Sequence, residues 1–396
     1  MANPFTYLSW DLMAVKPLDA LPFQGVTFGQ KLNAPGPWAG ALPLASPAVQ
    51  AMGWNQATLP SKTALFVDFL GTLVWGGIIW TRTYSKASPT LKVGASTFGS
   101  YFQSRLQAAD YSNTWSAGAD PMLVAQQLIA DAQAKAKGSV FGGIPLVLNP
   151  VGAEGGPRVA PSYPATSLQT IDSILSTLSQ MGYTFGFDYS FDVAYLPGTS
   201  TPAVKLNLWY PRQGRTYTQS QLVILGSDCV DYTYPEDGSQ QATSITETGS
   251  GTGGIQPTNA AAEIAGYPLL EKTFARTFVN DPGILANIAF GDLGILGYPV
   301  VTPTITIPIT LPDASGNVNQ GKINFGDFGV GDNLLFRIDP VGGGGENTDP
   351  RFPSGMSFEW RMTDWTATVP DKGLPTLLFD LAVPPVQSIP PPQPPV

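Results

Sequence analysis

Alternation of apolar and polar residues runs through most of the chain and predicts β-strands. Residues 8–12 place two leucines and a tryptophan on one side and a serine and an aspartate on the other, the period of a half-buried strand. Short apolar runs at 25–29 and 38–44 follow proline-containing breakers. The alternation returns in an aromatic run at 183–191 and an isoleucine run at 305–311. The pattern predicts a mostly β protein built from many short strands.

The most apolar run, at 64–80, allows two interpretations. A transmembrane helix needs about 20 predominantly apolar residues, whereas this run is shorter and contains Asp68. Its glycines and β-branched residues favour a β-hairpin that turns near Leu70 and Gly71. We therefore expect a hairpin and no membrane span here.

Three segments have the 3.6-residue period of amphipathic helices. Two helices are predicted at 120–138 and at 281–288, and each begins with an aspartate followed by a proline. Aspartate caps the start of a helix, and proline is favoured at the first helical position. A third apolar stripe runs through 168–182 and ends at a glycine. We expect the apolar side chains of all three, Leu123 included, to face a core.

Composition agrees with the pattern and limits the possible partners. Apolar residues make up 43% of the 396 residues, charged residues only 12%, and there are 43 glycines and 38 prolines, as in chains of short strands and tight turns. The net charge of −9 argues against a surface that grips nucleic acid, which needs clustered Lys and Arg. An acidic wall would still let a phosphate backbone pass without sticking.

Two absences in the sequence exclude most catalytic chemistry. The chain has no histidine, which removes imidazole-dependent triads, nearly all zinc sites and the commonest general base. Cys229 is the single cysteine, so no disulfide can form within the chain. The N-terminus lacks the features of a signal peptide, and we expect synthesis and folding in a cytoplasm.

Two distant segments, 65–83 and 335–368, share one pattern: a short strand, a connection, then Trp-x4-Trp-Thr-x-Thr. The tryptophans are Trp75 and Trp80 in the first segment and Trp360 and Trp365 in the second. Chance similarity is one interpretation, and two β-barrels of common design is the other. A separation of five residues puts each pair on opposite strand faces, unless Gly76 and Gly77 form a bulge.

Glycine-rich motifs do not specify a cofactor site. Residues 249–254 fit G-x-G-x-x-G, and a strand is plausible before them, but Pro257 prevents the immediate helix that a dinucleotide site needs. The four glycines at 342–345 lack the Lys-Ser/Thr of a phosphate loop. We expect both segments to be loops and predict no cofactor.

Pairs of carboxylates do not have the spacing that hydrolysis requires. Asp188 and Asp192 lie roughly 13 Å apart if they share a strand face, whereas glycoside hydrolysis needs roughly 5 to 9.5 Å. Asp228 and Asp231 are no better placed, and all four are interpreted as solvated or turn aspartates. The segment 313–317 lacks the ligands of a calcium loop and is predicted to be a hairpin turn. We predict no catalytic or metal-binding residues and no enzymatic activity.

Six motifs together resemble a known family. They are Tyr7-Leu-Ser-Trp-Asp-Leu12, Leu21-Pro-Phe-Gln-Gly-Val-Thr-Phe-Gly-Gln-Lys-Leu-Asn-Ala-Pro-Gly36, Gly40-Ala-Leu-Pro-Leu44, Val74-Trp-Gly-Gly-Ile-Ile-Trp80, Leu225-Gly-Ser-Asp-Cys-Val-Asp-Tyr-Thr-Tyr-Pro-Glu-Asp-Gly-Ser239 and Gly266-Tyr-Pro-Leu-Leu-Glu-Lys272. They resemble minor tail proteins, or baseplate hubs, of siphophages that infect actinobacteria. The chain is similar in the same way to the N-terminal hub region of tail-associated lysins and to the hubs of contractile-tailed phages.

The resemblance implies a fold class and a domain organisation. The expected fold is mostly β with helical insertions: two related antiparallel β-barrel tube domains plus inserted α/β segments. The expected parts are a first barrel at 1–92, an inserted α/β region at 93–221, strands returning to the barrels at 222–256, a helical insertion at 257–298, a second barrel at 299–388 and a polyproline tail at 389–396.

The function that the resemblance implies is structural. We expect a homotrimeric baseplate hub at the distal end of a virion tail, through which DNA passes into the host. Its implied partners are a sixfold distal tail or tube ring protein, the tape-measure protein, other minor tail or tail-fibre proteins and, at infection, the host envelope. Two alternatives stay open: a carboxylate-dependent cell-wall hydrolase, and a receptor-binding module that uses exposed aromatics such as Trp115 or Trp209.

Overall fold

The computed structural model describes residues 4–136, 143–145, 158–180, 186–215, 221–226, 228–249, 263, 266–276, 279, 282–310, 323–342 and 348–382. Within these ranges the chain is mostly antiparallel β with helical insertions, as predicted. The aromatic residues 183 and 185, all of the G-x-G-x-x-G motif after Gly249, the segment 313–317, three of the four loop glycines and the polyproline tail lie outside the described residues.

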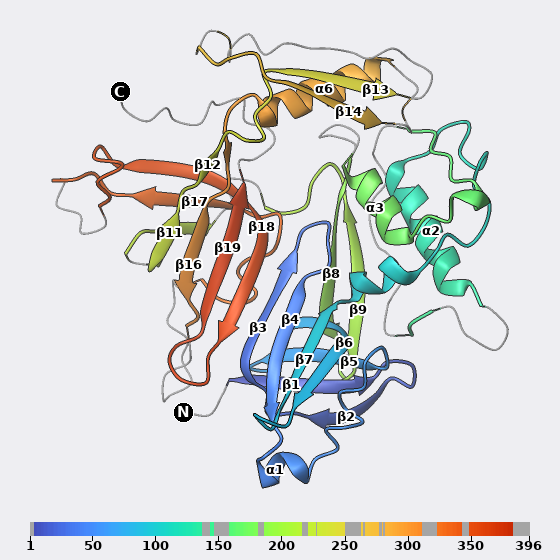
Figure 1. The fold of residues 1–396 in the computed structure, drawn as a ribbon, viewed down its shortest axis with the longest axis vertical. Helices are drawn as coiled ribbons and strands as arrows, with labels where there is room; N and C mark the ends of the chain where they lie inside the picture. The colour runs from blue at the N-terminus through green and yellow to red at the C-terminus, as the bar shows by residue number, and fades with distance from the viewer. Residues whose placement is uncertain are drawn as a thin grey trace.

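One large sheet of thirteen strands contains both ends of the described chain. Its N-terminal strands are β1 (Phe5–Asp11), β2 (Lys16–Ala20), β3 (Gln24–Lys31), β4 (Pro37–Pro43), β5 (Thr63–Phe69), β6 (Thr72–Ser85) and β7 (Thr90–Thr97). Its later strands are β10 (Gln221–Ile224), β11 (Asp231–Thr233), β16 (Thr304–Pro308), β17 (Asn333–Ile338), β18 (Met356–Val369) and β19 (Thr376–Ala382). The two sets join where β18 pairs antiparallel with β3, so that the strands from the two ends of the chain stand side by side (Figure 1).

Three two-stranded sheets and several helices complete the fold. The small sheets pair β8 (Asp188–Tyr195) with β9 (Pro202–Trp209), β12 (Glu236–Asp237) with β15 (Val300–Val301), and β13 (Ser244–Gly249) in parallel with β14 (Glu271–Arg276). The α-helices are α1 (Pro47–Gln50), α2 (Pro121–Ala134), α3 (Ile171–Ser179) and α6 (Pro282–Leu296), and η1 (Phe98–Ser104) and η2 (Ala165–Ser167) are 3-10 turns. Strands β12 and β15 form a stem below β13, β14 and α6, at the end of the molecule opposite α1 (Figure 1).

The domain boundaries expected from the sequence remain a prediction, but one strand crosses an expected boundary and another pairs outside its expected group. β7 continues past position 92 to Thr97 within the large sheet. β13 pairs with β14 next to α6 rather than with the strands of the large sheet. The β12–β15 pair, β13, β14 and α6 therefore form one insertion that lies outside the large sheet.

Two large hydrophobic cores lie on opposite faces of the N-terminal strands. The first fills the space between the N-terminal and C-terminal strands, and the second lies between β5, β6 and the inserted helices α2 and α3. β1 contributes to both, because Phe5 and Tyr7 belong to the first core and Trp10 to the second, together with Leu12 just after the strand. The strand predicted at 8–12 is confirmed, but it is buried on both faces rather than one.

The apolar run at 64–80 forms the predicted hairpin. β5 and β6 are joined at Leu70 (φ 53°) and Gly71 (φ 88°), where positive φ at both central residues matches the twist of a two-residue hairpin. The backbone N–H of Gly71 also donates to the Asp68 carboxylate at 2.8 Å. No helix among the described ranges is long and apolar enough to cross a membrane.

The predicted helix starts are confirmed where they are described. Asp120 accepts a hydrogen bond from the Met122 backbone N–H at 2.8 Å and caps α2. The helix ends at Ala134 rather than at the predicted position 138, because Lys135 adopts an extended conformation (ψ 117°). Leu123 was expected to face the core, and this prediction is wrong. It is 37% exposed, because Met122 and Val124 occupy the buried side of this turn.

The other two helices differ from their predicted lengths. α3 begins at Ile171 rather than 168, because Leu168 adopts a left-handed conformation (φ 46°) and Thr170 caps the helix. α6 extends to Leu296, well beyond the predicted end at 288. The buried face of α3 is apolar, as predicted.

The two Trp-x4-Trp segments form two long hairpins, β5–β6 and β17–β18, whose second strands both have 14 residues. In the first hairpin Trp75 belongs to the first core while Trp80 packs against the second, so the predicted opposite faces are confirmed. Gly76 and Gly77 keep a regular register in the pairing of β5 with β6, so they do not form the bulge that was considered. The irregularity in this strand pair lies at Val74.

The second hairpin contradicts the predicted facing of its tryptophans. Trp360 and Trp365 both lie in the first core. The pairing of β18 with β19 shifts between Met362 and Asp364, and this bulge at Thr363 inverts the alternation of the strand. One extra residue thus turns an odd spacing into a shared face.

Candidate functional site

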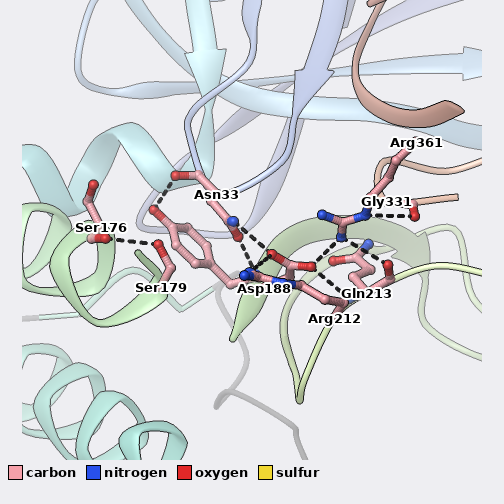
Figure 2. Close-up of polar contacts among 9 residues, drawn as sticks. Asn33, Ser176, Ser179, Asp188, Arg212, Gln213, Gly331 and Arg361 are labelled. Carbon is pink, nitrogen blue, oxygen red and sulfur yellow. Dashed lines mark hydrogen bonds and ion pairs between the residues drawn. The ribbon is translucent and has the colours of Figure 1, made fainter. Parts of the chain in front are cut away.

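Asp188 is the most enclosed charged residue among the candidates from the sequence. It starts β8, is 0% exposed and lies where three parts of the chain meet (Figure 2). Its carboxylate accepts hydrogen bonds from Asn33 Nδ2 at 2.8 Å and from the Gln213 backbone N–H at 2.9 Å. It forms ion pairs with Arg212, at 3.2 Å, and with Arg361.

Asn33 links the cluster formed by Asp188 and its hydrogen-bond and ion-pair partners to the turn between β3 and β4. It holds a left-handed conformation (φ 59°), and its side-chain oxygen accepts from the Tyr189 backbone N–H at 2.7 Å. The Tyr189 hydroxyl donates to the Asn33 carbonyl oxygen at 2.6 Å (Figure 2). Burial raises the pKa of Tyr189, which keeps the hydroxyl protonated as a donor.

Arg361 attaches the same cluster to β18. Its Nε donates to the Gly331 carbonyl oxygen at 3.2 Å and its Nη2 to the Gln213 carbonyl oxygen at 3.1 Å. The prediction that Asp188 is a solvated or turn aspartate is therefore wrong. Its charge is balanced by guanidinium groups from distant segments, an arrangement that joins the inserted region to both sets of strands.

A second ion pair reinforces this junction. The Arg215 backbone N–H donates to Asp332 Oδ1 at 2.8 Å, and its guanidinium Nε donates to Asp332 Oδ2 at 3.0 Å. Gly214 (φ 104°) packs so closely on Gly331 that an added Cβ would lie 2.1 Å from a backbone carbon. The segment after β9 is thus held against the start of β17.

The remaining candidate aspartates lie in separate environments. Asp192 is exposed and accepts hydrogen bonds from Gln30 and Asn207. Asp228 accepts from the Ile224 backbone N–H at 3.1 Å, and Asp231 is exposed on β11. Within the described ranges no group of three or more metal-ligating side chains is placed to hold a metal ion.

Glu247 is a buried carboxylate that the sequence patterns did not predict. Glu247 on β13 is 0% exposed and accepts from Arg276 Nε at 3.0 Å, and Arg276 Nη2 donates to Asp292 on α6 at 2.5 Å. Burial raises the pKa of Glu247 to about 7, against the opposing effect of Arg276. No local pattern reveals this group, because its three members come from three separate elements.

A threonine-rich surface covers the face of the large sheet opposite the first core. On β3, β16, β18 and β19 alternate residues point away from that core, and most of them are partly exposed, Gly29 and Arg361 being buried exceptions. These residues include Thr27, Thr304, Thr306, Thr366, Thr368 and Thr376. Lys31, Asp364 and Asp380 form one charged row across the same strands. Burial raises the pKa of Asp364 to about 6, with Lys31 opposing the shift and Asp380 adding to it.

α6 presents an uncharged apolar face to solvent. Leu285, Ile288 and Leu293 point inward, whereas Phe290 and Ile295 are 61% and 56% exposed. Asp292, the one charged residue of this helix, is engaged by Arg276. Helices that are apolar on all sides are ordinarily covered by other protein.

The two tryptophans considered for glycan recognition have different environments. Trp115 is 7% exposed and stacks on Tyr111 with ring centroids 5.3 Å apart. Trp209, at the end of β9, is 46% exposed. Burial of Trp115 counts against a role in surface recognition.

Comparison with known proteins identifies the fold through structure rather than sequence. No protein-family model matches this sequence, and no curated protein is recognisably related to it by sequence. The prophage MuSo2 43 kDa tail protein from Shewanella oneidensis superimposes with a TM-score of 0.59 at 13% identity, over 96% of this chain and 99% of that one.

Two further solved structures agree over nearly their whole lengths. The tail protein from Neisseria meningitidis MC58 gives a TM-score of 0.58 at 11% identity, covering 98% of each chain. The prophage tail protein gp18 from Listeria monocytogenes EGD-e gives 0.51 at 11% identity, covering 95% of this chain and 94% of that one. The chain therefore has a fold that occurs in phage tail proteins.

Proposed function

We propose that this chain is a structural phage tail-tip protein, a homotrimeric baseplate hub that forms the distal end of the tail tube. The observation that carries the proposal is the end-to-end similarity of fold to the 43 kDa prophage tail protein. The motifs quoted from the sequence extend the proposal to siphophages of actinobacteria and to a location at the tail tip of the virion. The role is one of assembly rather than catalysis.

The threonine-rich surface supports a path for DNA. Threonine hydroxyls keep this wall hydrated, and its charged row carries two aspartates beside Lys31. A surface of this kind offers no cluster of cations to bind phosphates, so a duplex can slide past it. In the proposed hub, this surface faces the lumen.

The outer face of α6 supports association with other subunits. Copies of a chain with a net charge of −9 repel one another, and this repulsion is smallest between uncharged surfaces. Phe290 and Ile295 offer apolar area of the kind that stabilises obligate interfaces. The proposed neighbours are a sixfold distal tail or tube ring protein, the tape-measure protein, and minor tail or tail-fibre proteins that reach the host envelope.

Mass measurement of the purified protein, together with electron microscopy of virions, tests the proposal. The expected results are a species three times the mass of the chain and density for its fold at the distal end of the tail tube. A protein that is strictly monomeric and absent from particles would refute the hub role.

A further inference from the structure

A pocket of about 190 Å³ opens between the inserted region and both sets of strands. One wall is aromatic and is formed by Phe325, Phe328 and Trp365, whose ring centroids lie 5.7 to 5.9 Å apart. The opposite side is formed by β8 and the start of β6, including Thr72 and Asp192. Phe325 and Phe328 are partly exposed, so their rings are open to the pocket.

Asp192 brings a carboxylate to this pocket, and the groups that donate hydrogen bonds to it are two amides and a hydroxyl. Its Oδ1 accepts from Gln30 Nε2 at 3.3 Å and from the Ser190 hydroxyl at 3.4 Å, and its Oδ2 accepts from Asn207 Nδ2. Lys205 stands opposite it on β9 and its charge acts on the carboxylate, but in the described part of the chain no hydrogen bond joins the two side chains, and Lys205 is exposed. A carboxylate has about four acceptor positions, so a place remains for a charged donor.

Two N–H groups that line the pocket are already engaged, which favours a ligand that mainly donates, although the Thr72 hydroxyl can both donate and accept. The indole N–H of Trp75 is already bound to the Gly29 carbonyl oxygen at 2.8 Å. The amide of Gln30 donates to the Phe191 carbonyl oxygen at 3.1 Å as well as to Asp192. A sugar needs both donors and acceptors from its site, whereas a guanidinium group needs acceptors and an aromatic face.

We propose that this pocket binds an arginine side chain presented by a neighbouring protein of basic character. The planar guanidinium would stack on the rings of Phe325 or Phe328 and donate to Asp192, which suits arginine better than the compact ammonium of lysine. The excess of acidic over basic residues, 29 against 20, favours a basic partner over a second copy of this chain. Such a contact would join this chain to one neighbour in the tail tip, and in this respect it rests on the proposed function.

Binding of a capped arginine to the isolated full-length chain tests the site without any assembly. N-acetyl-arginine methylamide, followed by ligand NMR, should bind saturably with a dissociation constant of about 1 mM, the range expected for one cation–π contact and one ion pair. Asp192→Asn should weaken binding about tenfold or more. Phe328→Leu, which keeps apolar volume but removes the ring, should weaken it several-fold.

Matched controls separate this site from general charge effects. Asp237→Asn, an exposed carboxylate on β12, should leave binding unchanged, and thermal unfolding should confirm that all variants are folded. N-acetyl-citrulline methylamide has a similar planar shape without the charge and should not bind. Equal binding of the two ligands, unchanged binding to Asp192→Asn, or no saturable binding by about 10 mM would each overturn the proposal.

A photo-crosslinking amino acid at the exposed position Thr72 identifies the partner in assembled particles. The expected adduct joins this chain to a different protein through a peptide that contains arginine. An adduct between two copies, or no adduct in intact particles, would overturn the choice of partner. Because the capped-arginine assay uses the isolated chain, failure of the pocket is distinguishable from failure of the tail-tip role.

Discussion

At the scale of single residues, the charge of Asp188 is tolerated in the interior because its partners arrive from other parts of the chain. The guanidinium groups of Arg212 and Arg361 and the amide of Asn33 replace the water that the carboxylate loses. Such a network contributes little net stability over apolar packing, but loss of one member leaves the others buried and uncompensated.

Substitution of Asp188 should therefore be costly. Asp188→Ala leaves two guanidinium groups without their anion and should lower the free energy of unfolding by about 3–5 kcal/mol. Urea denaturation followed by tryptophan fluorescence measures the change. Asp237→Asn, an exposed carboxylate, serves as control and should change stability by less than about 0.5 kcal/mol. A loss of the same size in both variants would contradict a special role for Asp188.

Glu247 makes the stability of the folded state depend on pH. Its pKa in the folded protein is raised to about 7 from an ordinary value of 4.5, so the folded state holds a proton that the unfolded chain releases. The stabilisation that the protonated Glu247 carboxyl group gives the folded state is complete below about pH 4.5 and is lost as pH rises through about 7. Hydrogen exchange of α6 should therefore accelerate between pH 5 and 8, beyond its intrinsic chemical dependence. Glu247→Gln should remove this dependence; an unchanged profile would refute the assignment.

At the scale of elements, the two long hairpins show how one residue decides which face a side chain occupies. β6 keeps its alternation between Trp75 and Trp80, which therefore enter different cores. β18 carries a bulge at Thr363, and Trp360 and Trp365 enter the same core. The shared motif is thus compatible with two different packing arrangements, and spacing alone does not distinguish them.

The β5–β6 turn is a place where the chain can be stabilised. Leu70 adopts φ 53°, a conformation that costs a leucine roughly 1–2 kcal/mol and costs asparagine less, and it is 50% exposed. Leu70→Asn creates the preferred Asn-Gly turn and should raise the free energy of unfolding by about 0.5–1 kcal/mol. Leu196→Asn, at another exposed leucine, should give no increase in the same urea titration. Equal effects at the two positions would argue against relief of turn strain.

At the scale of the whole molecule, the outer face of α6 is where the proposed assembly can be tested with least risk to the fold. The double variant Phe290→Glu, Ile295→Glu places two like charges on an exposed surface and should shift a trimer towards monomers. Analytical ultracentrifugation measures the mass, and an unchanged unfolding midpoint shows that the chain is intact. A trimer that persists would exclude this face from the subunit contacts.

The threonine-rich surface makes a separate prediction about DNA passage. Thr306→Lys with Thr366→Lys introduces cations that bind phosphates, and DNA ejection from particles should slow, with the effect decreasing as salt is raised. Thr199→Lys, in the exposed loop between β8 and β9, is the matched control and should eject normally. Equal ejection by both would mean that this surface does not face the lumen.

Features that depend only on neighbouring residues could be predicted from the sequence alone. Strand alternation, the turn at Leu70 and Gly71, and the cap at Asp120 all arise from chemistry within a few positions, which is why they were predictable. The absence of histidine excluded imidazole chemistry with no structure needed. The predominance of β structure followed from the same local patterns.

The tertiary structure alone decided which distant residues meet. Arg361 lies 173 positions from Asp188, and Glu247 meets Arg276 29 positions away, so neither partner is visible in a local pattern. The pairing of β18 with β3, the burial of β1 on both faces and the bulge at Thr363 likewise depend on the rest of the fold. Periodicity records whether a side chain is covered, but only the packed chain determines what covers it.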